Sequence, residues 1–304
     1  MKKIIFLLFS FFLGNYIISA QEFQGKAFYF SKSKMNLGSW GARMSEAEKK
    51  QVKERLKNRL EKTYILSFNT TESVFIEEEK IDAISGATDS WGANFARGEQ
   101  YKDVGENKLV QAQEFYGKRF LVQDQLQPIE WKMESEVREI GGYTCFKATA
   151  VVPTTDLSWF NFSWGDLNSN SDTSEEPEIQ LTQIEAWYTL QIPVKHGPAE
   201  FWGLPGLILE VSADETTMLC YEITINPKER NSIEAPAKGE VISKLDYRAT
   251  IIKKMTEMRN SYGRRRRSSP HNILASYEKN NLPCHPLKSI WVKSTKNHFF
   301  WGSA

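Results

Sequence analysis

The sequence predicts a mainly β protein of the α+β class, in which a curved antiparallel sheet or half-barrel is backed by one or two helices. Short runs of β-branched and aromatic residues recur along most of the chain and are separated by turn residues. Only two stretches, 46–62 and 244–259, have the spacing of apolar residues that is typical of helices. Strands and helices do not alternate as they would in a parallel sheet.

The expected strands are close together in sequence, and short turn signals join three pairs of them. In chain order the strands cover residues 23–31, 64–68, 73–78, 108–115, 118–123, 131–140, 143–152, 207–211 and 218–225. The turn signals are Tyr116-Gly117, Gly141-Gly142 and Asp214-Glu215. Hairpins place consecutive strands side by side, so an antiparallel sheet is expected.

Two helices complete the expected secondary structure. Ser45 and Glu48 form a capping box, and apolar residues then recur every fourth position up to Leu60, which predicts an amphipathic helix ending near Lys62. The second helix, 244–259, has an apolar stripe with which it would close the end of the sheet.

The first twenty residues have the pattern of a secretory signal peptide. Lys2 and Lys3 precede an apolar run, 4–13, and Ala20 supplies the small residue that a signal peptidase needs before Gln21. An uncleaved anchor helix is the alternative, but the apolar run is shorter than the ~20 residues that a bilayer span needs. We therefore expect a mature chain without a transmembrane segment, in the periplasm or at the cell surface.

The charge balance excludes one class of partner. The whole chain has 39 Lys and Arg residues against 38 Asp and Glu residues, a formal net charge of +1, and loss of Lys2 and Lys3 with the signal peptide would make it −1. Binding to nucleic acid or to an anionic membrane in bulk needs a net basic face. Nucleic acid is therefore not an expected partner.

A proline-rich segment leads into an apolar strand. Pro205 presets φ at the first central position of a turn, and Gly206 at the second is expected to take the positive φ of a type II turn. The strand 207–211 is apolar on both faces, which predicts that another layer covers it, with Glu210 at the rim or paired.

Four large aromatic residues surround this segment, and two interpretations of them stay open. Trp187, Tyr188, Phe201 and Trp202 would line a groove for an apolar or peptide ligand, which makes them the tentative ligand or partner surface. The alternative is that they pack in the core and anchor the proline turns.

These residues resemble the signature of the GLPGLI family. The matching residues, taken as the structural signature, are Gly197, Pro198, Gly203, Leu204, Pro205, Gly206, Leu207 and Ile208. The likeness extends over roughly residues 24–226 through similar segments at 25–29 and 131–148. It implies an exported Bacteroidetes protein that is associated with TonB-linked outer-membrane systems, with an outer-membrane transporter or another envelope protein as a partner.

The expected organisation has three parts: a signal peptide at 1–20, a GLPGLI-type β-rich domain at 21–262 and a C-terminal extension at 263–304. The domain contains a polar insertion, 153–183, with an aromatic island, and this insertion is either a lid or partner-binding flap, or disordered. The island consists of Trp159, Phe160, Phe162 and Trp164. The extension begins with Arg264, Arg265, Arg266 and Arg267, which would bind an anionic partner or form a solvated basic loop.

Three cysteines remain in the mature chain. Cys145 and Cys220 both lie in expected strands and form a possible disulfide in an oxidising envelope, which would leave Cys284 over. Free, buried thiols are the alternative.

The sequence contains no local catalytic motif, and no metal or cofactor is expected. The four histidines, His196, His271, His285 and His298, do not have the spacing of a zinc site. We therefore expect an exported, non-catalytic cell-envelope binding or interaction protein, accessory to an outer-membrane transport system. The alternatives are a periplasmic carrier, which holds a lipid or other apolar ligand in a concave sheet, and an enzyme of unrecognised class.

Overall fold

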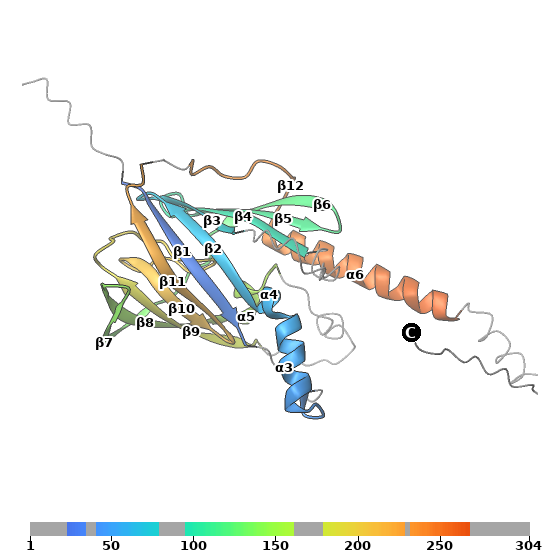
Figure 1. Ribbon diagram of the computed structural model, residues 1–304. Helices are drawn as coiled ribbons and strands as arrows, with labels where there is room; N and C mark the ends of the chain where they lie inside the picture. Colours follow the sequence, from blue (N-terminus) through green and yellow to red (C-terminus); the bar gives the residue numbers. More distant parts are fainter. Residues whose placement is uncertain (1–22, 35–40, 79–94, 161–178, 229–231, 268–304) are drawn as a thin grey trace, which may run out of the picture. The chain divides into compact units, whose positions relative to one another are not determined.

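The protein forms one large sheet with a few helices (Figure 1). The computed structural model describes residues 23–34, 41–78, 95–160, 179–228 and 232–267. The chain divides into two compact units, Met1–Lys253 and Lys254–Ala304, and all described strands lie in the first. None of the described helices combines the length and the apolar composition that crossing a bilayer requires.

The described residues contain twelve strands, which form a single sheet. In chain order they are β1 (Gly25–Ser33), β2 (Glu61–Phe68), β3 (Glu72–Glu77), β4 (Phe95–Asp103), β5 (Lys108–Phe115), β6 (Lys118–Gln125), β7 (Lys132–Ile140), β8 (Tyr143–Pro153), β9 (Leu181–Thr189), β10 (Leu207–Ala213), β11 (Thr216–Ile225) and β12 (Glu240–Ile242). Their order in the sheet is β12-β6-β5-β4-β3-β2-β1-β11-β10-β9-β8-β7. All neighbours are antiparallel except β12 and β6, which are parallel.

The connection from β6 to β7 shows that the sheet is strongly curved. These strands are ten positions apart in the sheet order, which would be roughly 48 Å in a flat sheet. Residues 126–131 alone connect them, and so short a segment spans at most roughly 25 Å. The sheet therefore bends round so that its two sides approach each other, as the predicted half-barrel requires.

Within the described residues four helices accompany the sheet: α3 (Glu46–Arg55), α4 (Lys57–Leu60), α5 (Thr154–Leu157) and α6 (Lys244–Arg267). The first turns of α6 pack on the sheet through Tyr247, whose ring lies 5.4 Å from that of Phe120 on β6 and 6.0 Å from that of Trp159 just after α5. The aromatic contacts thus fix α5 and the start of α6 on the inner side of the sheet.

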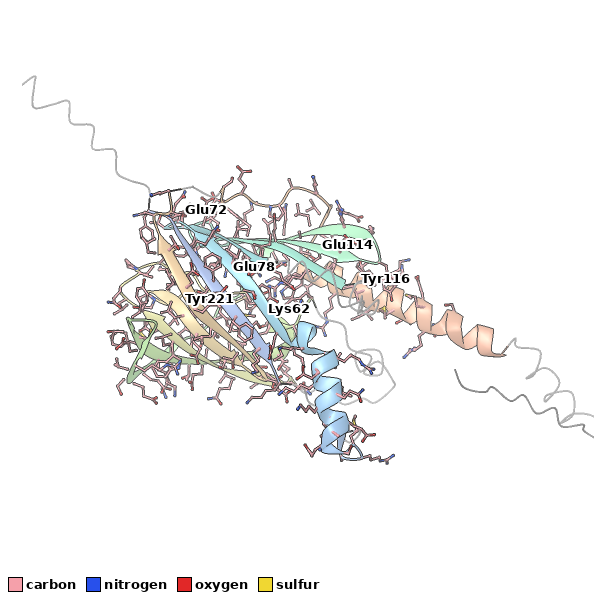
Figure 2. All side chains as sticks on the ribbon, viewed as in Figure 1. Lys62, Glu72, Glu78, Glu114, Tyr116 and Tyr221 are labelled. Atoms are coloured by element: carbon pink, nitrogen blue, oxygen red, sulfur yellow. The ribbon has the colours of Figure 1, made fainter. Side chains whose placement is uncertain are left out.

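The main core lies on the inner face. In β1 every second residue is buried, and Ala27 and Tyr29 are completely so. The Tyr29 hydroxyl donates to the Ile208 carbonyl oxygen at 2.6 Å, and the apolar strand β10 belongs to the same cluster. The same face becomes polar toward one end of these strands: Lys62 on β2, labelled in Figure 2, forms an ion pair with Glu77 on β3 at 2.7 Å.

Most elements follow the sequence prediction. The mainly β, antiparallel fold is confirmed, and so are the three hairpins. Tyr116-Gly117 and Gly141-Gly142 contribute two positive φ angles each, as type I′ turns need, and Asp214 has φ +52°. The capping box of Ser45 and Glu48 is also formed.

The structure differs from the prediction at several elements, and the short elements β12 and α5 are among those that were not expected. Neither β4 nor β9 was expected. The inner face of β4 is polar, so it lacks apolar alternation, and β9 begins inside the expected insertion 153–183. The first helix ends at Leu60, close to the predicted end, but it is interrupted at Leu56, and 61–68 then pair with β1 and β3. The last helix continues to Arg267.

The predicted insertion and domain limits are only partly described. Trp159 is buried and Phe160 lines a cavity, whereas Phe162 and Trp164 lie outside the described residues, as does the signal peptide 1–20. The domain limits at residues 262 and 263 stay a prediction.

Candidate functional site

The segment that joins β9 to β10, residues 190–206, lies against the inner face of the sheet; we call it the signature loop. Its apolar side chains are buried, among them Ile192 and Val194. It is also held by its own backbone, since the Ile208 N–H donates to the His196 carbonyl oxygen at 3.1 Å. The loop therefore occupies the concave side that the prediction left open.

Lys102 on β4 anchors this loop. Its Nζ donates to the carbonyl oxygens of Gly197, Ala199 and Phe201 at 2.7, 2.8 and 3.3 Å. Burial lowers the pKa of the Lys102 ammonium to about 7, and the carboxylate of Glu200 opposes this shift. Only the ammonium form has three N–H donors, so the three carbonyls stabilise the charged form.

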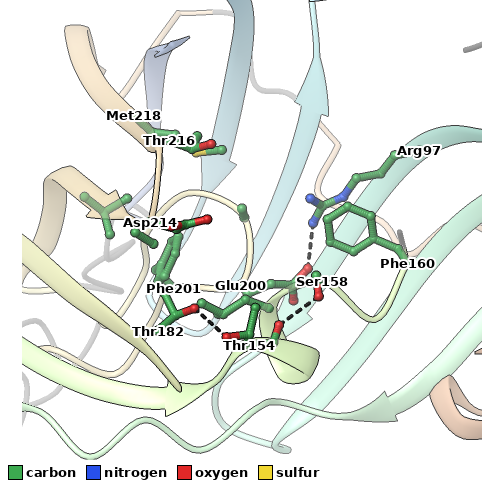
Figure 3. A pocket seen from close by; sticks show the side chains of 14 residues that line it. Arg97, Thr154, Ser158, Phe160, Thr182, Glu200, Phe201, Asp214, Thr216 and Met218 are labelled. Carbon is green, nitrogen blue, oxygen red and sulfur yellow. Dashed lines mark hydrogen bonds and ion pairs between the residues drawn. The ribbon is translucent and has the colours of Figure 1, made fainter. Parts of the chain in front are cut away.

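An unusual backbone conformation precedes the acidic residue of the site. Ala199 has φ +47°, which residues other than glycine rarely adopt. The Phe201 N–H donates to the Pro198 carbonyl oxygen at 3.0 Å and closes this turn. The Glu200 side chain is thereby directed toward β4 (Figure 3).

A β-bulge places two partners of Glu200 on one face of β4. Arg97 and Gln100 are three residues apart, so a regular strand would place them on opposite faces. Arg97 pairs with Gln113 and Gln100 with Gln111, which leaves one extra residue on β4. The Arg97 Nη2 and the Gln100 Nε2 donate to the same Oε1 of Glu200 at 2.8 and 3.0 Å.

The Arg97 guanidinium lies between a carboxylate and an aromatic ring. Its Cζ is 4.3 Å from the centre of the Phe160 ring, and its side chain is 20% exposed, against 6% for Glu200 (Figure 3). A guanidinium has five N–H donors. The contacts with Glu200 and with Gln111 use two of them, so further donors can meet a ligand.

A cavity of about 220 Å³ opens beside this ion pair (Figure 3). Its apolar walls come from Leu157, Phe160, Phe201, Val211 and Met218. Besides Arg97 and Glu200, the polar lining consists of hydroxyl groups and a second carboxylate, from Thr154, Ser158, Thr182, Asp214 and Thr216. A cavity with mainly apolar walls and a few convergent polar groups suits a small molecule with one polar end.

His196 lies fully buried behind the signature loop. Its Nε2 is 3.1 Å from the Asn69 carbonyl oxygen and therefore donates, while Nδ1 is buried without a partner among the described residues. Burial lowers the pKa of the His196 imidazole to about 3, with a smaller contribution from the Lys102 charge. The other three histidines lie outside the described residues, within which no three His, Cys, Asp or Glu side chains are grouped to hold a metal ion.

The four aromatic residues of the predicted ligand surface are not brought together. Trp187 and Tyr188 are consecutive residues of β9 and both are buried, Trp187 under the Arg138 guanidinium at 4.0 Å. Phe201 lines the cavity. The Trp202 indole N–H donates to the carbonyl oxygen of residue 127 at 2.7 Å, which ties the loop to the β6–β7 connection.

The signature residues act as expected in the core but not in the turn. Leu204, Leu207 and Ile208 are completely buried. The positive φ in this segment, +97°, belongs to Gly203, so the prediction that Gly206 takes it in a type II turn is wrong. Gly206 is instead needed for space, because a Cβ there would lie 2.0 Å from the Thr189 carbonyl oxygen.

The remaining signature residues belong to the same packing. A Cβ on Gly197 would meet the Ile208 side chain at 2.7 Å, and Pro198 opens the turn that leads to Glu200. Glu210 is paired with Arg138, which confirms one of its two predicted roles.

The possible disulfide between Cys145 and Cys220 is not formed, since both residues are free, buried thiols. Cys145 is on β8 and Cys220 on β11, and β9 and β10 lie between these strands. Three strand spacings amount to roughly 14 Å, whereas a disulfide needs Cα atoms within about 7 Å. Burial raises the pKa of Cys145 to about 11 and that of Cys220 to about 12.

The arginine cluster Arg264, Arg265, Arg266 and Arg267 forms the last residues of α6, so the prediction of a basic loop directly after the helix is wrong. The helix has good helix formers in this stretch, since arginine has a high helix propensity. The side chains of these four residues lie outside the described part of the structure.

Three residues of the site, Lys102, Arg97 and Gln100, were missed by the sequence analysis because β4 lacks apolar alternation and was not expected as a strand. Glu200 could have been found from the sequence. It is an acidic residue between apolar ones, in a segment of the signature that was expected to be buried. A buried carboxylate needs a basic partner, and such a partner had to come from elsewhere in the chain.

The chain is similar to a family of unknown function and to some solved structures. A family described as protein of unknown function (Porph_ging) matches residues 131–210. No curated protein matches significantly. Two structures of PNGF-II are similar: one, in space group C2, has a TM-score of 0.45, 16% identity and coverage of 76% of this chain and 33% of its own. The other, in space group P21, has a TM-score of 0.42, 15% identity and coverage of 75% of this chain and 33% of its own. The chain thus spans about a third of the length of PNGF-II.

Proposed function

We propose that this chain is an exported binding protein of the cell envelope, which takes a small, mainly apolar molecule into the cavity beside Arg97 and Phe160. The observation that carries this proposal is the cavity itself, since apolar walls from β10, β11, α5 and the signature loop converge on one ion pair. That arrangement is typical of small-molecule sites.

The size and charge of the cavity limit the ligand. Its volume of about 220 Å³ is below the ~300–1,000 Å³ of sites for drug-sized molecules. A single ring or a short chain fits this volume, with a polar end beside the Arg97–Glu200 pair. A long lipid in an open concave sheet, the second function expected from the sequence, is less well supported, because the signature loop covers that face.

Binding without turnover agrees best with the environment of the buried amine. All three N–H donors of Lys102 are directed at backbone carbonyls, so this amine supports the loop and faces no reacting group. The Glu200 carboxylate is likewise held by two donors. An enzyme of unrecognised class remains the third candidate.

We also infer membership in the GLPGLI family. The matched segment 131–210 contains the complete hexapeptide, Gly203 to Ile208, and the turn at Glu200, which supports this assignment. With it come the proposals of a Bacteroidetes-type source and of a periplasmic or cell-surface location after removal of residues 1–20. A TonB-linked outer-membrane transporter is then the proposed partner.

Two neighbouring residues of β11 provide a sharp test. Met218 lines the cavity, whereas Leu219 is 37% exposed and does not line it. We expect Met218→Trp to fill the cavity and Leu219→Trp to leave it open. Protein purified from its native envelope is extracted with organic solvent, and the extract is analysed by mass spectrometry.

The expected result is one small molecule, near one equivalent, in the wild type and in Leu219→Trp, and its loss in Met218→Trp. Equal amounts in all three proteins, or no bound molecule in any of them, would exclude the proposal. Circular dichroism shows whether both variants keep the β fold.

A further inference from the structure

The helix α3 carries a row of lysines and buries none of its residues, although it begins with a complete capping box. Lys49 and Lys53 on α3 and Lys57 at the start of α4 follow one another at four-residue intervals. Like charges at this spacing lie on one side of a helix and destabilise it. A bound anion would remove that repulsion.

The lysine row faces the end of β1 across an open groove of about 700 Å³. We call it the lysine groove. Its lysines are Lys32 and Lys34 from the end of β1 and Lys49, Lys50, Lys53 and Lys57 from the helical side. Three glutamates also line it, so lysines outnumber acidic residues by two to one.

Only part of this positive charge is neutralised. Lys49 is paired with Glu46 at 2.6 Å, and Lys32 with Glu61 at 3.7 Å. The other four lysines have no carboxylate within ion-pair distance in the described parts of the chain. Both walls of the groove therefore offer unpaired ammonium groups, which are available to an anionic partner.

The spacing of the lysines indicates the form of the partner. Residues four apart on a helix are separated by roughly 6 Å along its axis. In an extended peptide every second side chain points to the same side, roughly 6.6 Å apart. Carboxylates at alternate positions of such a peptide would match Lys53 and Lys57 one to one, and Lys49 continues the row one turn earlier, where Glu46 pairs with it.

We propose that the lysine groove binds an extended, acidic peptide segment of a partner protein, with carboxylates at alternate positions. The groove receives a narrow chain between its two walls, and α3 has no apolar face that would insert into a bilayer. This proposal is independent of the ligand in the cavity beside Arg97.

The test uses the full chain and a fluorescein-labelled octapeptide of alternating aspartate and glycine, with fluorescence anisotropy as the readout. We expect binding at low ionic strength, and its loss at about 1 M salt, where the Debye length is ~3 Å. The variant Lys50→Glu/Lys53→Glu/Lys57→Glu should bind at least about tenfold more weakly, because three attractive contacts become repulsive.

A matched control distinguishes binding in the lysine groove from an effect of the protein's net charge. Lys108→Glu/Lys132→Glu/Lys253→Glu makes the same change in net charge at three exposed lysines outside the groove, and it should bind like the wild type. The variant Lys50→Gln/Lys53→Gln/Lys57→Gln, with helicity followed by circular dichroism, covers the case in which charge reversal unfolds α3. It should also bind more weakly.

Four results would overturn the proposal. The first is wild-type affinity of the groove variants for the octapeptide, and the second is an equal loss of affinity in the control variant. The third is a peptide with four consecutive aspartates, and so with equal charge, that binds as tightly as the alternating one. Binding to vesicles that contain phosphatidylglycerol, without binding to the octapeptide, would assign the groove to a membrane surface instead.

Discussion

At the scale of single residues, two glycines of the signature have different physical roles. A Cβ on Gly206 would overlap the Thr189 carbonyl oxygen at 2.0 Å, whereas a Cβ on Gly203 would meet the Trp131 indole at an ordinary 3.7 Å but the residue has a φ of +97°. We expect Gly206→Ala to lower the free energy of unfolding by at least about 3 kcal/mol. Gly203→Ala should cost only about 1–2 kcal/mol, the strain of a left-handed alanine.

Urea unfolding of the two variants beside the wild type measures both effects. A larger loss for Gly203→Ala than for Gly206→Ala would show that conformation, and not space, is what the hexapeptide requires. The sequence alone did not distinguish these roles, because both glycines lie within two residues of Pro205.

The buried imidazole of His196 makes stability depend on pH. Its pKa falls from 6.5 to about 3 on folding, so between these values the unfolded chain binds a proton that the folded protein does not. Acidification in this range therefore favours unfolding, by up to about 1.4 kcal/mol per pH unit. His196→Gln keeps a donor for the Asn69 carbonyl and cannot titrate.

The measurement compares the free energy of unfolding of wild type and His196→Gln from pH 7 to pH 4. The wild type should lose stability more steeply, since other acidic groups contribute equally to both proteins. Parallel curves would show that folding does not lower the pKa of His196, which would contradict its burial in the structure.

At the scale of elements, the signature loop depends on Lys102. Lys102→Met removes the terminal amine, keeps most of the length of the side chain, and leaves the carbonyls of Gly197, Ala199 and Phe201 without their donor. We expect a loss of roughly 2 kcal/mol or more, because buried acceptors stay unpaired. Hydrogen exchange should become faster in residues 196–203 before it does in the strands.

Lys108→Met is the matched control, since Lys108 is exposed at the start of β5. It should change the stability by no more than about 0.5 kcal/mol. Unchanged exchange in the loop of Lys102→Met would show that the apolar residues Ile192 and Val194 hold the loop without this anchor.

The helix α3 should behave as a local unit. Ser45→Ala removes the side chain that caps it, which costs about 1 kcal/mol of helix stability. Because α3 has no buried residue, we expect faster hydrogen exchange in 46–55 and no change in the melting temperature of the sheet. A clear drop in that melting temperature would reveal packing that the structure does not show.

The elements differ in how far sequence reasoning can reach. The hairpins at Tyr116-Gly117 and Gly141-Gly142 were predictable because local turn chemistry decides them. β4 was not, since Gln100 and Lys102 face inward only because the signature loop brings acceptors to them. The same holds for the cysteines: their strands were predicted, but their separation by β9 and β10 depends on the order of the whole sheet.

At the scale of the whole molecule, strand pairing over long sequence distances should make folding slow. Gly25 on β1 pairs with Ile225 on β11, two hundred residues later. Sheets dominated by such contacts fold in milliseconds to seconds or more slowly. Stopped-flow refolding from urea, followed by tryptophan fluorescence, measures this, and refolding complete within a millisecond would contradict it.

The central position of β1 in the sheet has a further consequence. This first strand pairs with β2 on one side and with β11 on the other, so one of its edges stays open until Thr216–Ile225 has been made or delivered. When the chain emerges amino end first, from a ribosome or through a translocation pore, the backbone groups on that edge of β1 therefore stay unpaired until most of the chain has emerged. A chaperone that recognises exposed backbone in extended conformation would have its best opportunity in that interval.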